Sequence, residues 1–137
     1  MDADETRALL DAPSAAVLAV YRADGSNLMS PVWFRAVDDA VEIVIAEGDA
    51  KLERLRADPQ CVFMAFETAP PFRGLRIEAA ATLSSDGVRE TRLAIASRYL
   101  GSEDGRRYVE QRTKPGVVVR LPLANARTWD LSGILPS

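Results

Sequence analysis

Short strand-like segments joined by tight turns dominate this chain of 137 residues, and they restrict its fold more than any other feature. The segments AAVLAVYR (15–22) and NLMSPVWFRA (27–36) flank an Asp-Gly turn, which is typical of a β-hairpin. After another short turn, VEIVIA (41–46) predicts a third strand of an antiparallel meander. Four further strands are expected at residues 60–67, 74–85, 117–123 and 126–131.

Helical patterns are few and short. They predict helices at residues 4–11, 50–58 and 89–100, and a fourth that starts at Ser102 as its N-cap. Strands and helices do not alternate throughout, which argues against a doubly wound parallel sheet. Six or seven mainly antiparallel strands with short peripheral helices predict an α+β fold centred on a small β-barrel. The length fits a single domain, residues 1–137.

Composition excludes several classes of function. The chain has no histidine, so histidine-based catalytic triads, His-ligated zinc and proximal-histidine haem are ruled out. A net charge of −3 argues against nucleic-acid binding through phosphate neutralisation. The single cysteine forms no intrachain disulfide, no apolar run approaches the roughly 18 residues of a membrane span, and the first residues lack a basic signal-peptide start. We expect a cytoplasmic protein without a membrane partner.

One of only two lysines lies in the segment AEGDAKLERLRADP (46–59), directly after the acids Glu47 and Asp49. If Ala50 opens a helix, Lys51 lies in the first turn, where free backbone N–H groups and the helix dipole favour a bound anion such as phosphate. The alternative is a solvated lysine on a short surface helix. Asp49 is expected to cap this helix, and it would then occupy an amide that a phosphate could otherwise use.

Pro31 interrupts the second predicted strand. Because proline cannot donate a hydrogen bond to a sheet, it predicts an edge strand, a bulge or a place where something other than a strand lies alongside. Trp33 and Phe34 then point to opposite faces, so one aromatic ring can be buried while the other lines a groove. A structural bulge with a core tryptophan would explain the pattern equally well. Trp129 is expected to be a core residue that closes the barrel.

Other reactive or charged side chains have simpler interpretations. Cys61 alternates with Phe63 and has no evident base or cation beside it, so we expect a buried apolar residue rather than a nucleophile. No catalytic residue and no metal site is indicated. Four arginines could either extend a groove for a charged tail or lie on a solvated face: Arg54, Arg56, Arg73 and Arg76.

Five segments cover nearly the whole chain in a characteristic order: AVLAVYRADGSNLMSPVWF (16–34), VEIVIAEGDAKLERLRADPQCVFM (41–64), RGLRIEAAATL (73–83), ASRYLG (96–101) and VVVRLPLANARTWD (117–130). In this order they resemble the pyridoxamine 5′-phosphate oxidase-like split β-barrel superfamily. Within it, the chain is similar to the flavin- and deazaflavin (F-420)-dependent oxidoreductases common in actinobacteria.

The resemblance implies a homodimer with cofactor sites at the subunit interface, and FMN or the deazaflavin coenzyme F-420 as the cofactor. Lys51 falls at the family's phosphate-binding lysine. The usual reaction is hydride transfer to a small unsaturated substrate, which suits a chain without histidine because the cofactor performs the chemistry. Pro31, Val32 and Trp33 fall on the strand that lies along the ring system. The remaining candidate cofactor-binding residues surround Lys51: Ala46, Asp49, Ala50 and Arg54.

Ala46 and Asp49 depart from the family pattern, in which Ser or Thr is frequent near the first position and Arg or Ser near the second. Two unit charges about 4 Å apart interact by about 1–4 kcal/mol at effective dielectric constants of about 80 to 20, so Asp49 would oppose a phosphate. FMN ends in a phosphomonoester close to a dianion, whereas F-420 carries a phosphodiester with one charge, so F-420 is preferred. Two other hypotheses stay open: a non-catalytic flavin or deazaflavin carrier, and a degenerate barrel that has lost the cofactor.

Overall fold

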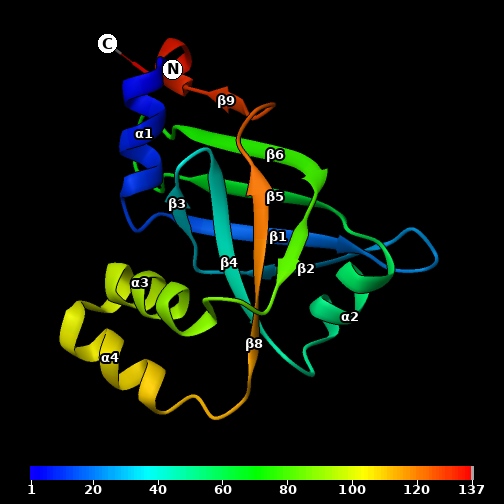
Figure 1. Cartoon of the computed structure of the whole chain (residues 1–137). Helices are drawn as coiled ribbons and strands as arrows, with labels where there is room; N and C mark the ends of the chain where they lie inside the picture. The colour runs from blue at the N-terminus through cyan, green and yellow to red at the C-terminus, as the bar shows by residue number, and fades with distance from the viewer. Residues whose placement is uncertain (137) are drawn as a thin grey trace.

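The computed structural model describes residues 1–136, so the predicted domain end at residue 137 lies outside the described residues (Figure 1). Its helices are α1 (Ala3–Asp11), α2 (Ala50–Ala57), α3 (Val88–Leu100), α4 (Ser102–Glu110) and the 3-10 helix η1 (Leu131–Ile134). Its strands are β1 (Ala15–Tyr21), β2 (Asn27–Pro31), β3 (Arg35–Val37), β4 (Ala40–Ala46), β5 (Gln60–Phe66), β6 (Gly74–Ala80), β7 (Thr82–Ser84), β8 (Gly116–Pro122) and β9 (Arg127–Trp129). Within residues 1–136, none of the helices combines the length and apolar character that a bilayer crossing needs.

The strands form two antiparallel sheets, and the predicted α+β split barrel is confirmed. One sheet has the order β2-β1-β5-β6-β9 and the other β3-β4-β8-β7. The chain passes from the first sheet to the second twice, between β2 and β3 and between β6 and β7. These two crossings hold the sheets face to face, and the core fills the space between them.

The strand prediction was too simple at both crossings. Each of two long apolar segments, 27–36 and 74–85, was taken as a single strand, but each divides between the two sheets, which raises the number of strands in the described residues to nine. The three-strand meander was therefore wrong, because β2 and β3 belong to different sheets. Pro31 ends β2 at the edge of its sheet, one of the alternatives that its missing N–H predicts.

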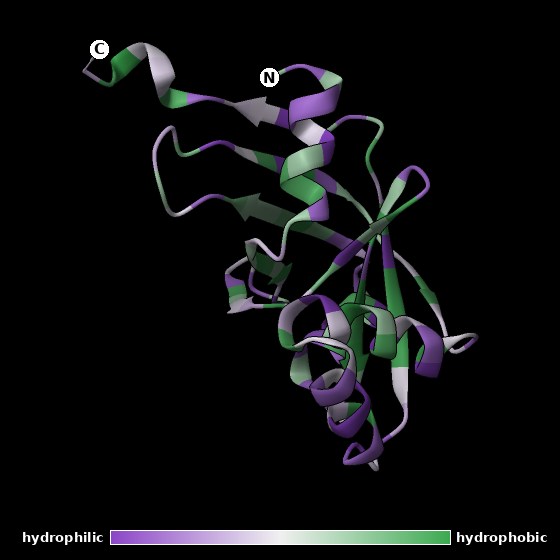
Figure 2. Ribbon diagram, turned by 90° about the vertical axis from the view of Figure 1, so that its left-hand side faces the viewer, coloured by the Kyte–Doolittle hydropathy of each residue, from purple (hydrophilic) through white to green (hydrophobic). Residues whose placement is uncertain are grey.

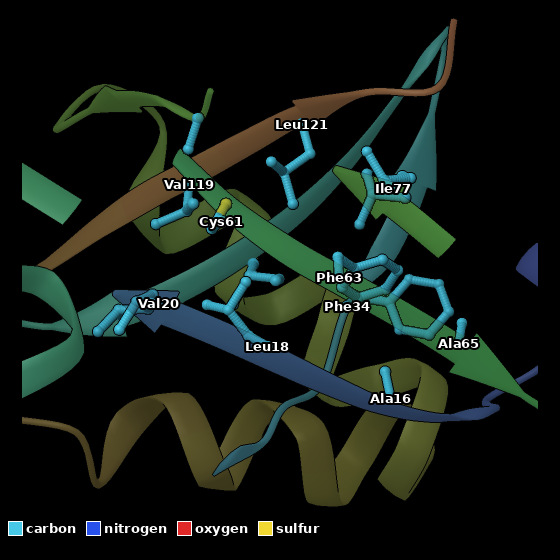
Figure 3. Packing of buried hydrophobic residues seen from close by; sticks show 14 of the residues in the cluster. Ala16, Leu18, Val20, Phe34, Cys61, Phe63, Ala65, Ile77, Val119 and Leu121 are labelled. Atoms are coloured by element: carbon cyan, nitrogen blue, oxygen red, sulfur yellow. The ribbon is translucent and has the colours of Figure 1, made fainter. Parts of the chain in front are cut away.

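The core lies between the inner faces of the sheets. Figure 3 shows Phe34 and Phe63 in contact between strands of the two sheets, and their ring centroids are 5.2 Å apart in an edge-to-face arrangement. Cys61 is buried in the same cluster, as predicted, and burial raises the pKa of its thiol to about 11. A thiol in this state is a packing residue and a poor nucleophile at neutral pH.

Two expectations for individual residues were wrong. Ser102 is the first residue of α4 and not its N-cap, because α3 ends at Leu100 and Gly101 makes the turn with φ +86°. Trp129 is only half-buried, because β9 is a three-residue edge strand. Its ring instead packs across its cross-strand neighbour Gly74, where a Cβ would collide with the indole.

Helices α3 and α4 pack together on the outside of the second sheet (Figure 1). At their contact, a Cβ on Gly105 would lie 2.8 Å from the Cα of Ser97, so only glycine allows this close approach. Figure 2 shows hydrophilic colour on much of this helix pair and hydrophobic colour along the strands behind it. Helix α3 therefore covers part of the outer face of the second sheet, including β4, and α4 packs on α3.

Candidate functional site

A cavity of about 310 Å³ lies where α3, the start of α2 and the crossing after β2 meet the outer face of β4. It combines aliphatic and aromatic walls with charged side chains. The lining residues are Pro31, Val32, Trp33, Ile43, Val44, Ile45, Ala46, Asp49, Lys51, Arg92, Ile95, Ala96 and Tyr108. Six of the eight residues predicted from the sequence are thus brought together: Pro31, Val32, Trp33, Ala46, Asp49 and Lys51.

Lys51 lies in the first turn of α2, which begins at Ala50 as predicted. Asp49 is the N-cap of this helix, and its carboxylate makes two contacts with Lys51. Its Oδ1 accepts a hydrogen bond from the backbone N–H of Lys51 at 2.9 Å, and its Oδ2 lies 3.0 Å from the ammonium Nζ. Lys51 is therefore a cation already paired with an acid, and its side chain is only 17% exposed.

The ionisation of Asp49 follows from these contacts. Burial raises the pKa of its carboxyl, but the hydrogen bonds and the positive charge of Lys51 outweigh burial, so the pKa lies below its ordinary value of 3.8. Asp49 is ionised at neutral pH. An anion that enters the cavity therefore meets a carboxylate as well as an ammonium group.

The second acid of this segment plays a different part. Glu47 is turned away from Lys51 and makes a two-pronged ion pair with Arg56, with N–O distances of 2.8 and 2.6 Å. Arg54, a predicted site residue, does not line the cavity, because its Nε donates to the backbone carbonyl of Tyr21 at 2.8 Å. Ala50 is exposed and also lies outside the lining.

Trp33 is held by a cluster of aromatic side chains from the helix pair. Its ring stacks on Tyr99 of α3 with centroids 5.1 Å apart and an interplanar angle of 10°, and it meets Tyr108 of α4 at 5.2 Å. The guanidinium of Arg98 fixes the same segment by donating to the carbonyl oxygens of Phe34, Leu10 and Ala12. Phe34 is fully buried while Trp33 is 37% exposed, so the two rings do point to opposite faces.

The sequence analysis missed three lining residues of β4, Ile43, Val44 and Ile45, and all four that come from the helix pair. Arg92, Ile95, Ala96 and Tyr108 reach the cavity from α3 and α4, far along the chain from Lys51. A signal for one of them exists in the sequence. Arg92 precedes the buried Ile95 and Ala96 by three and four residues, so a charged residue lies on the apolar face of the helix.

A second, more open cavity of about 680 Å³ adjoins the first at Trp33. It shares Pro31, Val32 and Trp33 with the first cavity. The rest of its lining comes from the segment after α1, the start of β1, the end of β5 with the loop that follows it, and Tyr99 of α3. Arg73 borders it but is paired with Glu67 at 2.7 Å. Of the four arginines considered from the sequence, Arg56, Arg73 and Arg76 are held in ion pairs within the chain, and Arg54 in its bond to Tyr21.

The geometry gives the first cavity one charged end and one aromatic wall. Such a site can hold an anionic group beside the start of α2 and a flat ring beside Trp33. Since the described residues offer no histidine and no reactive thiol, these side chains can bind, orient and exclude water, whereas hydride or electron transfer would need a cofactor.

Three solved structures share this fold at low sequence identity. The conserved hypothetical protein Rv2991 from Mycobacterium tuberculosis is 22% identical with a TM-score of 0.84, over 100% of this chain and 90% of that chain. An F420 reductase is 20% identical with a TM-score of 0.63, over 88% of this chain and 94% of that chain. An FAD-binding protein from Mesorhizobium loti is 18% identical with a TM-score of 0.70, over 96% of each chain. At these identities the likeness establishes the fold alone.

No curated protein matches the sequence. The family model for pyridoxamine 5′-phosphate oxidase, in contrast, matches residues 3–130. This match includes both sheets, all four α-helices and every residue that lines the first cavity. The chain belongs to the pyridoxamine 5′-phosphate oxidase family.

Proposed function

We propose that the protein is an oxidoreductase that binds a flavin-type cofactor in the first cavity and transfers a hydride to a small unsaturated substrate. The observation that carries the proposal is the placement of Lys51 at the start of α2, in one cavity with Trp33. The family supports it, as do a structural relative that is named an F420 reductase and another that is named an FAD-binding protein.

The residues of the cavity fit such a group. Flavins and deazaflavins join a flat, largely apolar ring to a phosphorylated tail. Val44 and Ala46 are half-buried on the outer face of β4 and, with Trp33, offer an apolar wall for a ring. Lys51 and Arg92 offer positive charge for the tail. The cofactor, when bound, supplies the hydride chemistry that the protein's own side chains lack.

The protein's part in catalysis is therefore positioning. Trp33, fixed by Tyr99 and by the anchored crossing, sets one wall and keeps water from that side of the cavity. Lys51 and Arg92 at the charged end hold the anionic tail and so fix the register of the ring along β4. A small substrate has to meet the ring in the first cavity itself, and the residues Pro31, Val32 and Trp33, which line both cavities, connect it with the more open second one.

Coenzyme F-420 is preferred over FMN because of Asp49. Its carboxylate touches the Lys51 ammonium, so it repels any anion that Lys51 attracts. The electrostatic repulsion by Asp49 is larger for the near-dianionic phosphomonoester of FMN than for the singly charged phosphodiester of F-420.

The proposal includes a homodimer in the cytoplasm. Met29 of the edge strand β2 is 65% exposed, and Trp33 nearby is also partly exposed. A second copy of the chain would cover these apolar side chains and narrow the open second cavity.

Cofactor titration tests the proposal. F-420 and FMN are each titrated into the purified protein, and binding is followed by fluorescence. Micromolar affinity for either cofactor, lost in Lys51→Ala, is the expected result. Absence of binding by both would overturn the proposal and favour a barrel that has lost its cofactor.

Turnover separates an enzyme from a carrier. The loaded protein is mixed with a panel of enones, quinones and tetrapyrroles, and oxidation of the reduced cofactor is followed by absorbance. A protein that binds but oxidises the cofactor with none of them would be a carrier, and the reductase assignment would then fail.

A further inference from the structure

We propose that Arg92 is the principal cation for the anionic group in the first cavity, and that Lys51 and Asp49 act beside it as a neutral pair. This inference rests on the proposed function and deepens it, because it names the residue that binds the tail and the charge of tail that the site accepts.

Lys51 is not a free cation. Its ammonium lies 3.0 Å from Asp49, and the same carboxylate is fixed by its N-cap bond to the Lys51 backbone. The carboxylate cannot swing away from the ammonium without also leaving the helix cap. A bound anion therefore meets a pair with no net charge, which offers N–H donors but little attraction.

Arg92 makes no ion pair with another residue of the described range, 1–136. Among residues 1–136, eight arginines make ion pairs with carboxylates, and Arg92 is not one of them. Its side chain nevertheless reaches the wall of the same cavity from the apolar face of α3 and is half-buried there. A half-buried guanidinium without a carboxylate has donors to offer to a ligand, and its planar fork suits phosphate oxygens.

The sheet beneath Arg92 leaves room for its guanidinium. A Cβ on Gly116 would collide with Nη2 of Arg92 and would lie only 3.0 Å from Val44. Gly116 is paired with Ala46 across β4 and β8, and Ala46 itself lines the cavity. The guanidinium therefore lies over a floor of two small residues next to the start of α2.

The charges of the site follow from these contacts. The charges of Lys51 and Asp49 cancel, so Arg92 gives the site one net positive charge. This charge matches a singly charged phosphodiester better than a dianionic monoester. Removal of Lys51 alone would leave Asp49 facing the anion, so loss of binding in Lys51→Ala does not by itself identify Lys51 as the main ligand.

A set of variants separates the two roles. Dissociation constants for F-420, FMN and inorganic phosphate are measured for the wild type, Arg92→Gln, Lys51→Ala and the double variant Lys51→Ala/Asp49→Ser. Serine keeps the helix cap and removes the carboxylate. We expect Arg92→Gln and Lys51→Ala each to bind F-420 about 10- to 100-fold more weakly, and the double variant to return to within about threefold of the wild type.

Two further variants control for charge and for folding. Arg89→Gln removes an exposed arginine of the same helix that lies outside the cavity, and we expect unchanged affinity. Gly116→Ala keeps every charge but displaces the guanidinium, so we expect weaker binding. The added Cβ would also lie 3.0 Å from Val44 and 3.1 Å from Val88, so a loss of melting temperature is expected as well. Thermal unfolding of each variant shows that it is folded.

The outcomes are distinguishable. If the wild type binds F-420 and Arg92→Gln binds it equally well, or if the double variant stays as weak as Lys51→Ala, the assignment of Arg92 is wrong while the cofactor proposal stands. If neither cofactor binds but phosphate does, and Arg92→Gln loses it, the cofactor proposal fails and the assignment of Arg92 stands. If none of the three probes binds, both are overturned.

Discussion

Asp49 has two functions that oppose each other, and a pair of substitutions can separate them. It caps α2 through the bond to the Lys51 N–H, and it adds negative charge beside the Lys51 ammonium. Serine retains capping and removes the charge, whereas alanine removes both. Asp49→Ser and Asp49→Ala should therefore differ in stability but resemble each other in the sign of their effect on anion binding.

The magnitudes follow from the geometry. Loss of an N-cap costs about 1 kcal/mol, and α2 has only 8 residues, of which Leu52 and Leu55 are buried in the core. The ion pair adds only about 0.5 kcal/mol, because Asp49 is 35% exposed and solvent screens the attraction. The free energy of unfolding should then fall by about 1.5 kcal/mol in Asp49→Ala and by about 0.5 kcal/mol in Asp49→Ser. This difference corresponds to about 4 °C in melting temperature.

Circular dichroism melting at neutral pH and cofactor titration together test this account. Because the folded-state pKa of Asp49 is lowered, its charge contributes stability above about pH 4 and loses that contribution as the pH falls through the folded-state pKa. The difference in melting temperature between the wild type and Asp49→Ser should therefore become smaller as the pH is lowered. Binding of F-420 should tighten by about 2- to 10-fold in Asp49→Ser, since a nearby carboxylate is removed. Equal melting temperatures for the two variants would refute the capping role, and unchanged or weaker binding in Asp49→Ser would refute the electrostatic one.

Three other predictions concern the core and the cavity wall. Phe34→Ala should cost about 3–5 kcal/mol in urea unfolding, because Phe34 is fully buried against Phe63, and a loss below about 1 kcal/mol would contradict this packing. Cys61 should react slowly with iodoacetamide at pH 8, since burial raises its pKa to about 11, and rapid labelling of the folded protein would show that the thiol is accessible. Cofactor binding should quench tryptophan fluorescence in Trp129→Phe but not in Trp33→Phe, because only Trp33 lines the first cavity; equal quenching in both variants would place the ligand elsewhere.

The sequence predicted those features that depend on local patterns. Alternating apolar residues and turn signals located the strands, and acidic, capping and proline residues located the ends of α2. The pairing of Asp49 with the Lys51 backbone was also foreseeable, because N-capping is decided within a few residues. These features include most of the fold and one end of the candidate site.

What the sequence could not show is where a strand changes sheets. Residues 27–36 keep their apolar character through the crossing, because Val32 and Phe34 remain partly or wholly buried after β2 has ended. Only long-range contacts define the break, such as the bond from Arg98 to the Phe34 carbonyl across 64 residues. Periodicity has no information about such a contact, so one long strand was the natural prediction.

The same limitation accounts for the missing half of the site. Arg92 and Lys51 are 41 positions apart, and they share a cavity only because α3 folds back over the outer face of β4, the strand that leads into α2. A charge on the buried face of α3 was visible in the sequence, but its partner could be a carboxylate, a carbonyl or a ligand. Among the described residues, no carboxylate pairs with Arg92, and its guanidinium lies above Gly116 and Ala46. In the proposed site, Asp49 can therefore keep its role as helix cap, because Arg92 on another helix supplies the positive charge that Asp49 cancels at Lys51.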